Sequence, residues 1–144
     1  MRISAKVFLA CGLWLIALGI YFVLLRPALL PEDSRYIGIP LESLRAAAPG
    51  LERWLGHVFD VLGGFMLAAG ALTALTAWHL RGLRSVGAFV SLLVAGIAGV
   101  GMMSVTNFLL FSDFRWLLLA PGALWALGLA CYLREHVAQP MEAP

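Results

Sequence analysis

Four long stretches of the chain are apolar and almost free of charged side chains, and this pattern limits the fold more than any other feature. They cover residues 7–25, 54–78, 86–111 and 116–133. A helix rises about 1.5 Å per residue, so about 20 apolar residues cross the roughly 30 Å of hydrocarbon in a bilayer. The pattern therefore predicts an all-α fold, an integral membrane four-helix bundle, with residues 1–144 as a single transmembrane domain.

The composition points to the same class of protein. Hydrophobic residues make up 62% of the chain and charged residues 12%, against about 45–50% and about 25% in soluble domains. One core of a chain this short cannot hide so much apolar surface from water. The net charge is only +2, which excludes a nucleic-acid surface because such a surface needs a basic stripe. We therefore expect the lipid bilayer as the main partner.

The distribution of basic residues sets the expected orientation. The first apolar run has 19 residues, longer than the apolar region of a signal peptide, which is about 7–15 residues. With the N-terminus inside, five basic residues fall on each side, but the inner five lie in short segments. Four of the outer five are spread over the loop 26–53 and are offset there by acidic residues. We expect a bacterial inner-membrane protein with both termini cytoplasmic and this loop outside.

Prolines divide the loop 26–53. Between Pro40 and Pro49, the apolar residues of segment 41–48 are spaced by three and four, which predicts a short helix lying on the bilayer surface. The same spacing resumes at Leu51, so the second membrane helix is expected to begin there. The connections 80–85 and 112–115 are short, which makes the last three spans antiparallel neighbours.

Small residues recur at every fourth position of the second and third spans. These positions are Gly56, Asp60, Gly64 and Ala68 on the second span, and Gly87, Ser91, Ala95 and Gly99 on the third. Such ridges let helix backbones approach closely in lipid, so we expect the two spans to meet there. Gly12 and Gly19 on the first span are candidates for the same role. This packing favours a structural or accessory protein, which associates as a homo-oligomer or within a membrane complex.

Two ionisable side chains, His57 and Asp60, lie three residues apart on one face of the second span. If Trp54 marks the outer interface, Asp60 lies roughly 9 Å below it at the rise of a helix, too deep for full hydration. Asn107 precedes Asp113 by six residues on the third span and so lies at a matching depth. Ionisable groups at such depths normally face the interior of the protein.

The depths lead us to expect one outward-facing polar pocket, formed by His57, Asp60, Asn107 and Arg115, with Arg26 and Asp113 at its rim. In it, His57 and Asp60 are the candidates for a proton-handling pair, since burial raises a carboxyl pKa and a neighbouring cation lowers it. The arginines suit an anionic head group. The alternative function is therefore binding or catalysis on a lipid, a quinone or another amphiphile. A buried ion pair of Asp60 with an arginine is the simpler explanation of the same residues.

No pattern supports a metal or a cofactor. Cys11 and Cys131 lie in separate apolar runs, which favours packing over a disulfide or a metal site. His57 is expected near one membrane face and His79 and His136 near the other, which excludes bis-histidine haem ligation within one chain. The sequence contains no HExxH, phosphate-binding glycine loop or GxSxG motif.

Three segments resemble a known group of proteins. They are residues 30–38 (LPEDSRYIG), 41–45 and 54–64 (WLGHVFDVLGG). Together they are similar to the first loop and second helix of small bacterial four-helix membrane proteins of DoxX-like layout. In that group a proline, acidic residues and an aromatic-x-Gly step precede a His-Asp element at the head of the second helix. Here Val58 and Phe59 separate His57 from Asp60. The resemblance implies the four-helix fold and brings no established activity.

Overall fold

The computed structural model describes residues 2–79 and 86–137, and every regular element in this part is helical. The elements are α1 Ile3–Leu24, α2 Pro31–Ile37, α3 Leu41–Ala47, α4 Leu51–His79, α5 Val86–Ala95, the π-helix η1 Gly96–Gly101, α6 Met102–Leu109 and α7 Arg115–Val137. Four helical stretches are long and apolar enough to cross a membrane: Ile3–Leu24, Leu51–His79, Val86–Leu109 and Arg115–Glu135. The four predicted spans are thus confirmed as helices. The expected connection 80–85 lies outside the described residues.

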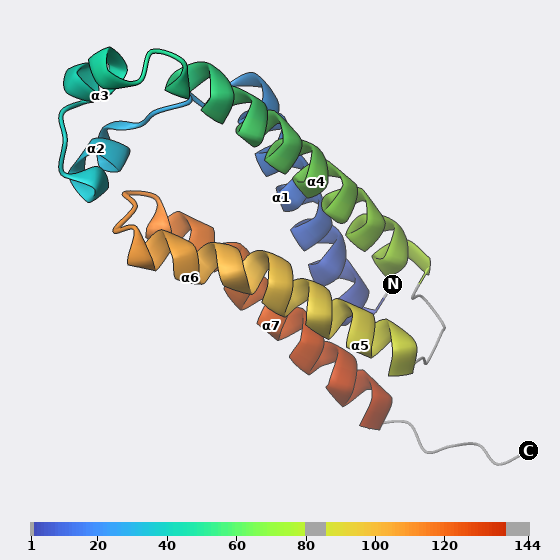
Figure 1. Ribbon diagram of the computed structural model, residues 1–144. Helices are drawn as coiled ribbons and strands as arrows, with labels where there is room; N and C mark the ends of the chain where they lie inside the picture. The colour runs from blue at the N-terminus through green and yellow to red at the C-terminus, as the bar shows by residue number, and fades with distance from the viewer. Residues whose placement is uncertain (1, 80–85, 138–144) are drawn as a thin grey trace, which may run out of the picture.

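α1 and α4 form an antiparallel pair whose backbones touch at two glycine contacts (Figure 1). A Cβ atom on Gly70 would lie 2.7 Å from the carbonyl oxygen of Gly12, and one on Gly19 would lie 2.8 Å from that of Gly63. The two glycines of each helix are seven residues apart, so both lie on one helix face. Glycine is required at these positions because any side chain would push the helices apart.

The expected contact between the second and third spans is wrong. α4 packs on α1 rather than on α5, and a Cβ atom on Gly56, Gly64 or Gly99 would meet nothing within 4 Å. The reason is that α4 turns the face bearing Gly63 and Gly70 inward, and that face differs from the ridge through Gly56 and Gly64. α5, η1 and α6 pack on α7 instead, so the chain forms two antiparallel hairpins (Figure 1).

The hairpins meet through α1 and α7. Phe8 is fully buried there, edge-on to Trp125 with ring centroids 5.5 Å apart, and in close contact with Gly128. One turn before Phe8, the Ser4 hydroxyl donates to the Glu135 carboxylate at 2.6 Å and the Ser4 backbone N–H donates to it at 3.1 Å. These bonds place the start of α1 beside the end of α7.

The third span contains a π-helical turn between α5 and α6. The backbone N–H of Met102 bonds to the carbonyl of Ile97, five residues back, as in a π-helix. Just before this turn, the Trp125 indole N–H donates to the Leu92 carbonyl at 2.9 Å. The indole ring occupies the space that a side chain on Gly96 would need, with Cδ1 only 2.5 Å from a Cβ placed there.

The first loop contains two short helices. α3 matches the helix predicted for 41–48, and α4 begins at Leu51 as expected. α2 was not predicted: it starts where Asp33 accepts a bond from the Leu30 backbone N–H at 2.7 Å, and it ends at Gly38, whose φ of 79° is left-handed. This conformation favours glycine.

Candidate functional site

His57 and Asp60 lie on the outside of the molecule. Their side chains are 77% and 55% exposed, with His57 Nδ1 3.6 Å from Asp60 Oδ2. Neither residue lines either of the two cavities described below. The expected pocket shared by His57, Asp60, Asn107 and Arg115 is therefore not formed. The pocket is not formed because Gly63 and Gly70, rather than the polar residues of α4, lie on the face of this helix that packs inward.

Asp113 and Arg115 lie in and next to the turn between α6 and α7. Asp113 forms an exposed ion pair with Arg35 of α2, with Nη2 and Oδ2 2.6 Å apart. Arg115 is the first residue of α7 and is half-buried, but neither it nor Asp113 lines a cavity. Asp113 thus contributes to the attachment of the loop, and the backbone N–H of Arg115 bonds to the Ser112 carbonyl within the turn at 3.2 Å.

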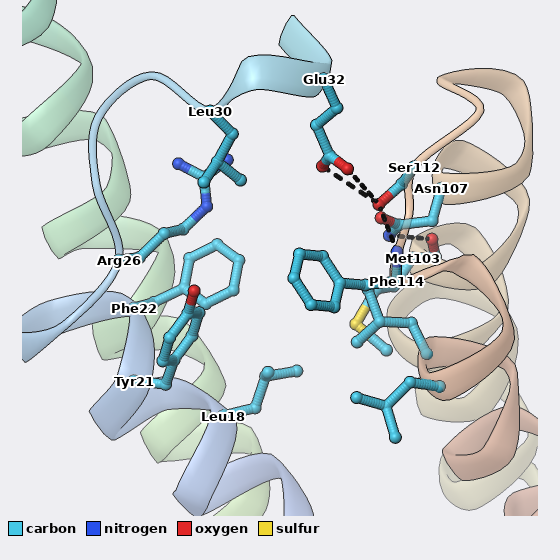
Figure 2. A pocket seen from close by; sticks show the side chains of 12 residues that line it. Leu18, Tyr21, Phe22, Arg26, Leu30, Glu32, Met103, Asn107, Ser112 and Phe114 are labelled. Carbon is cyan, nitrogen blue, oxygen red and sulfur yellow. Dashed lines mark hydrogen bonds between the residues drawn. The ribbon is translucent and has the colours of Figure 1, made fainter.

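Arg26 and Asn107 do come together, in a cavity of about 300 Å³ between α1, α2 and the α6–α7 turn (Figure 2). The Arg26 guanidinium lies 3.6 Å from the ring centre of Phe59 and 5.2 Å from that of Phe22, and it donates to the Pro27 carbonyl at 3.0 Å. Cation–π contacts of this kind hold a guanidinium in place. Among the described residues, Arg26 has no carboxylate within ion-pair distance.

Partial burial lowers the pKa of Arg26 from its ordinary value, while the charges of Asp33, Tyr21 and Glu32 act in the opposite direction. A guanidinium remains charged throughout the physiological range. Arg26 is therefore a fixed, half-buried positive charge that faces a cavity. Asn107 adds a polar group from the opposite hairpin: its Nδ2 donates to the Met103 carbonyl at 2.8 Å.

Two residues of this cavity, Glu32 and Ser112, were missed in the sequence. The Glu32 carboxylate accepts bonds from the Ser112 hydroxyl at 3.1 and 3.2 Å and from the Asp113 backbone N–H at 2.8 Å. These contacts hold α2 against the α6–α7 turn (Figure 2). No local sequence signal identifies the pair, because 80 residues separate Glu32 from Ser112.

A larger groove of about 680 Å³ lies between α4 and the third span. Its walls are mostly apolar, and its polar residues include Thr73, Thr76, Ser91 and Thr106. Phe22, Met103 and Asn107 line both this groove and the smaller cavity. The two spaces are thus adjacent, with a polar end at Arg26 and Glu32 and an apolar body between the hairpins.

The arrangement suits noncovalent binding of a molecule with one polar end. Ligand pockets are typically 300–1,000 Å³, mainly apolar, with a few polar groups that fix orientation. Within 2–79 and 86–137, no three His, Cys, Asp or Glu side chains are grouped to hold a metal ion. Comparisons of the chain with protein-family models, curated proteins and solved structures find no match.

Proposed function

We propose that the protein binds an amphiphile between its two hairpins, with the polar end in the Arg26 cavity and the apolar part in the groove. The observation that carries this proposal is the shared lining of the two spaces by Phe22, Met103 and Asn107. A ligand whose apolar part fills the groove can therefore extend into the smaller cavity, where its polar end meets charged groups. The amphiphiles of this class include lipids and quinones.

The groove supports this proposal because an empty space of its size is unfavourable. Apolar walls without a partner lose their dispersion contacts, and in a membrane the available filler is an acyl or isoprenoid chain. The DoxX-like resemblance remains a hypothesis about layout and adds no ligand. The proton-handling role of His57 and Asp60 is not part of this proposal, because both lie outside the cavities.

Two neighbouring alanines of α4 give a matched test. Ala69 lines the groove and Ala68 does not, and both are exposed. In Ala69→Trp the indole should occupy the groove, so native mass spectrometry of the detergent-purified protein should show less bound phospholipid. Ala68→Trp should retain as much phospholipid as the unmodified protein. Equal retention by the two variants would contradict amphiphile binding in the groove.

A second function, association with another copy or with another membrane subunit, is favoured by the outer face of α4. Gly56 and Gly64 have open space around them, and Asp60 lies exposed between them. A charged group facing lipid is costly, so a partner helix on this face would stabilise it. Gly64→Leu should then lower the oligomer fraction in cross-linking, while Gly99→Leu on the third span should not. No oligomer in the unmodified protein would refute association with another copy.

The membrane placement also belongs to the proposal: an inner membrane, a four-helix bundle across it, and both termini on the cytoplasmic side. The Ser4–Glu135 bonds support a common side for the two ends of the described chain. Trp54 and Trp116 are exposed near one end of their spans, where an interfacial aromatic belt would lie. A cysteine in place of Ser43, in a variant without native cysteines, should react with an impermeant maleimide in intact cells. Reaction only after permeabilisation would reverse the orientation.

A further inference from the structure

The smaller cavity contains one positive and one negative side chain that are not paired with each other. Arg26 approaches from the chain that follows α1, and Glu32 approaches from α2 on the other side of the space (Figure 2). In the described part of the chain neither forms an ion pair. The cavity therefore presents two separated charges of opposite sign.

Each charge is held in its place by neutral groups. Phe22 and Phe59 lie against the Arg26 guanidinium, which also bonds to the Pro27 carbonyl. The Glu32 carboxylate is held by the Ser112 hydroxyl and a backbone N–H. Collapse of the two charges onto each other would break these contacts, so both stay available to a ligand.

A ligand of a single charge would satisfy only one side of this cavity. An anion bound at Arg26 would leave Glu32 as a nearby like charge, and a cation bound at Glu32 would leave Arg26 unpaired. We infer that the cavity binds the zwitterionic head group of an aminophospholipid, with its phosphate on Arg26 and its ammonium on Glu32. This inference rests on the proposed function, because the groove must hold the acyl chains.

The chemistry of the two groups fits their assigned partners. A guanidinium binds phosphate through two parallel N–H···O bonds. Glu32 is acceptor-only when ionised and retains lone pairs beyond the bonds that it accepts, and an ammonium supplies three donors. The cavity of about 300 Å³ has room for about ten water molecules at about 30 Å³ each, enough for a phosphoethanolamine group.

The test compares two lipids with identical palmitoyl and oleoyl chains, phosphatidylethanolamine and phosphatidylglycerol. Both are added in equal amounts to delipidated protein in detergent, and bound lipid is counted by native mass spectrometry. A charge-assisted hydrogen bond between ammonium and Glu32 should give phosphatidylethanolamine an advantage of about tenfold. Equal binding, or a preference for phosphatidylglycerol, would overturn the inference.

Three variants assign the preference to its residues. Glu32→Gln should abolish the advantage of phosphatidylethanolamine, while the amide oxygen of glutamine can still accept a bond from Ser112. Arg26→Gln should weaken binding of both lipids, because both carry the phosphate. Glu42→Gln removes the same charge as Glu32→Gln from the exposed surface of α3 and should leave the preference intact. An advantage that survives Glu32→Gln, or that is lost in Glu42→Gln, would overturn the assignment.

The failure of this inference is distinguishable from the failure of the proposed function. Total bound lipid, and its loss in Ala69→Trp, reports on the groove; the ratio between the two lipids reports on the head-group site. Lipid bound without a preference would refute the inference alone, and no bound lipid would refute both. Soluble phosphoethanolamine should not displace the lipid at equal concentration. Full displacement would assign the site to a free phosphoamine instead of a lipid.

Discussion

Replacement of Gly70 by alanine should separate α1 from α4 and destabilise the protein. The new methyl group would lie 2.7 Å from the Gly12 carbonyl oxygen, 2.8 Å from the backbone nitrogen of Ile16 and 2.9 Å from Ile16 Cγ1. Ordinary contact begins at 3.4 Å, so the closest pair of atoms would be about 0.7 Å too near. If the helices move apart by this distance to relieve the overlap, a gap of the same size opens at their other contacts, and each of these loses a quarter to a half of its dispersion energy. Two of the three opposing atoms belong to the backbone and cannot rotate away.

The size of the effect follows from a matched control. Gly64→Ala lies on the same helix, and its methyl group would meet nothing within 4 Å. Both variants gain the same helix preference of alanine over glycine, about 0.5–1 kcal/mol. The difference between their free energies of unfolding therefore isolates the steric term, which should be about 1–3 kcal/mol, the usual cost of overpacking.

The measurement is reversible unfolding in mixed micelles with a rising fraction of dodecyl sulfate, followed by circular dichroism. Gly12→Ala added to Gly70→Ala should cost less than Gly12→Ala alone, because the first methyl group already moves the two helices apart at this contact and the effects of neighbouring sites are not additive. A difference between Gly70→Ala and Gly64→Ala below about 0.5 kcal/mol would refute the close backbone contact, because it falls under the range for overpacking.

Two further pairs of substitutions test two other helix contacts. Gly96→Ala should displace the Trp125 ring and leave the Leu92 carbonyl without its donor, which should lower the free energy of unfolding by about 2 kcal/mol or more in the same assay. The control is Gly99→Ala, which has open space around the new methyl group and should not lower it. Equal losses in the two variants would contradict the contact between Gly96 and Trp125. Ser4→Ala removes the 2.6 Å bond to Glu135 and should lower stability by about 1 kcal/mol, with a smaller loss in Glu135→Gln, which keeps an acceptor. A Ser4→Ala protein of unchanged stability would mean that this bond does not hold the hairpins together.

The sequence predicted the helices well because their signal is local. An uncharged apolar run shows where a span lies, and the return of helical spacing at Leu51 marked the start of α4. α2 has local signals as well, with Pro31 at its start, Glu32 and Asp33 in its first turn and Gly38 at its end, but its segment was not predicted as a helix. Its contacts to the rest of the molecule run from Glu32 and Arg35 to residues 78 to 81 positions away. These long-range contacts, which place α2 beside the cavity, could not be predicted from its own segment.

The candidate site was predicted only in part because position along a helix does not determine direction around it. Arg26 and Asn107 were expected on one side of the molecule, and both line the smaller cavity. His57 and Asp60 lie on an exposed face instead. Which face of α4 turns inward depends on how Gly63 and Gly70 pack against Gly19 and Gly12 of α1. Such a pairing cannot be predicted from the sequence of either helix alone.

The π-helical turn sets the direction of the residues that follow it in the third span. A π turn contains one residue more than an α turn, and each residue of a helix rotates the following ones by about 100°. The wider turn at Gly96–Gly101 takes up this extra residue, so the helix after it keeps the direction that it would have in a span one residue shorter. If the same residues formed regular α-helix throughout, Asn107 would be rotated by about 100°, away from both spaces. Asn107 thus faces the ligand space because of the shape of a turn that precedes it, and loss of the π turn would remove it without any change at position 107 itself.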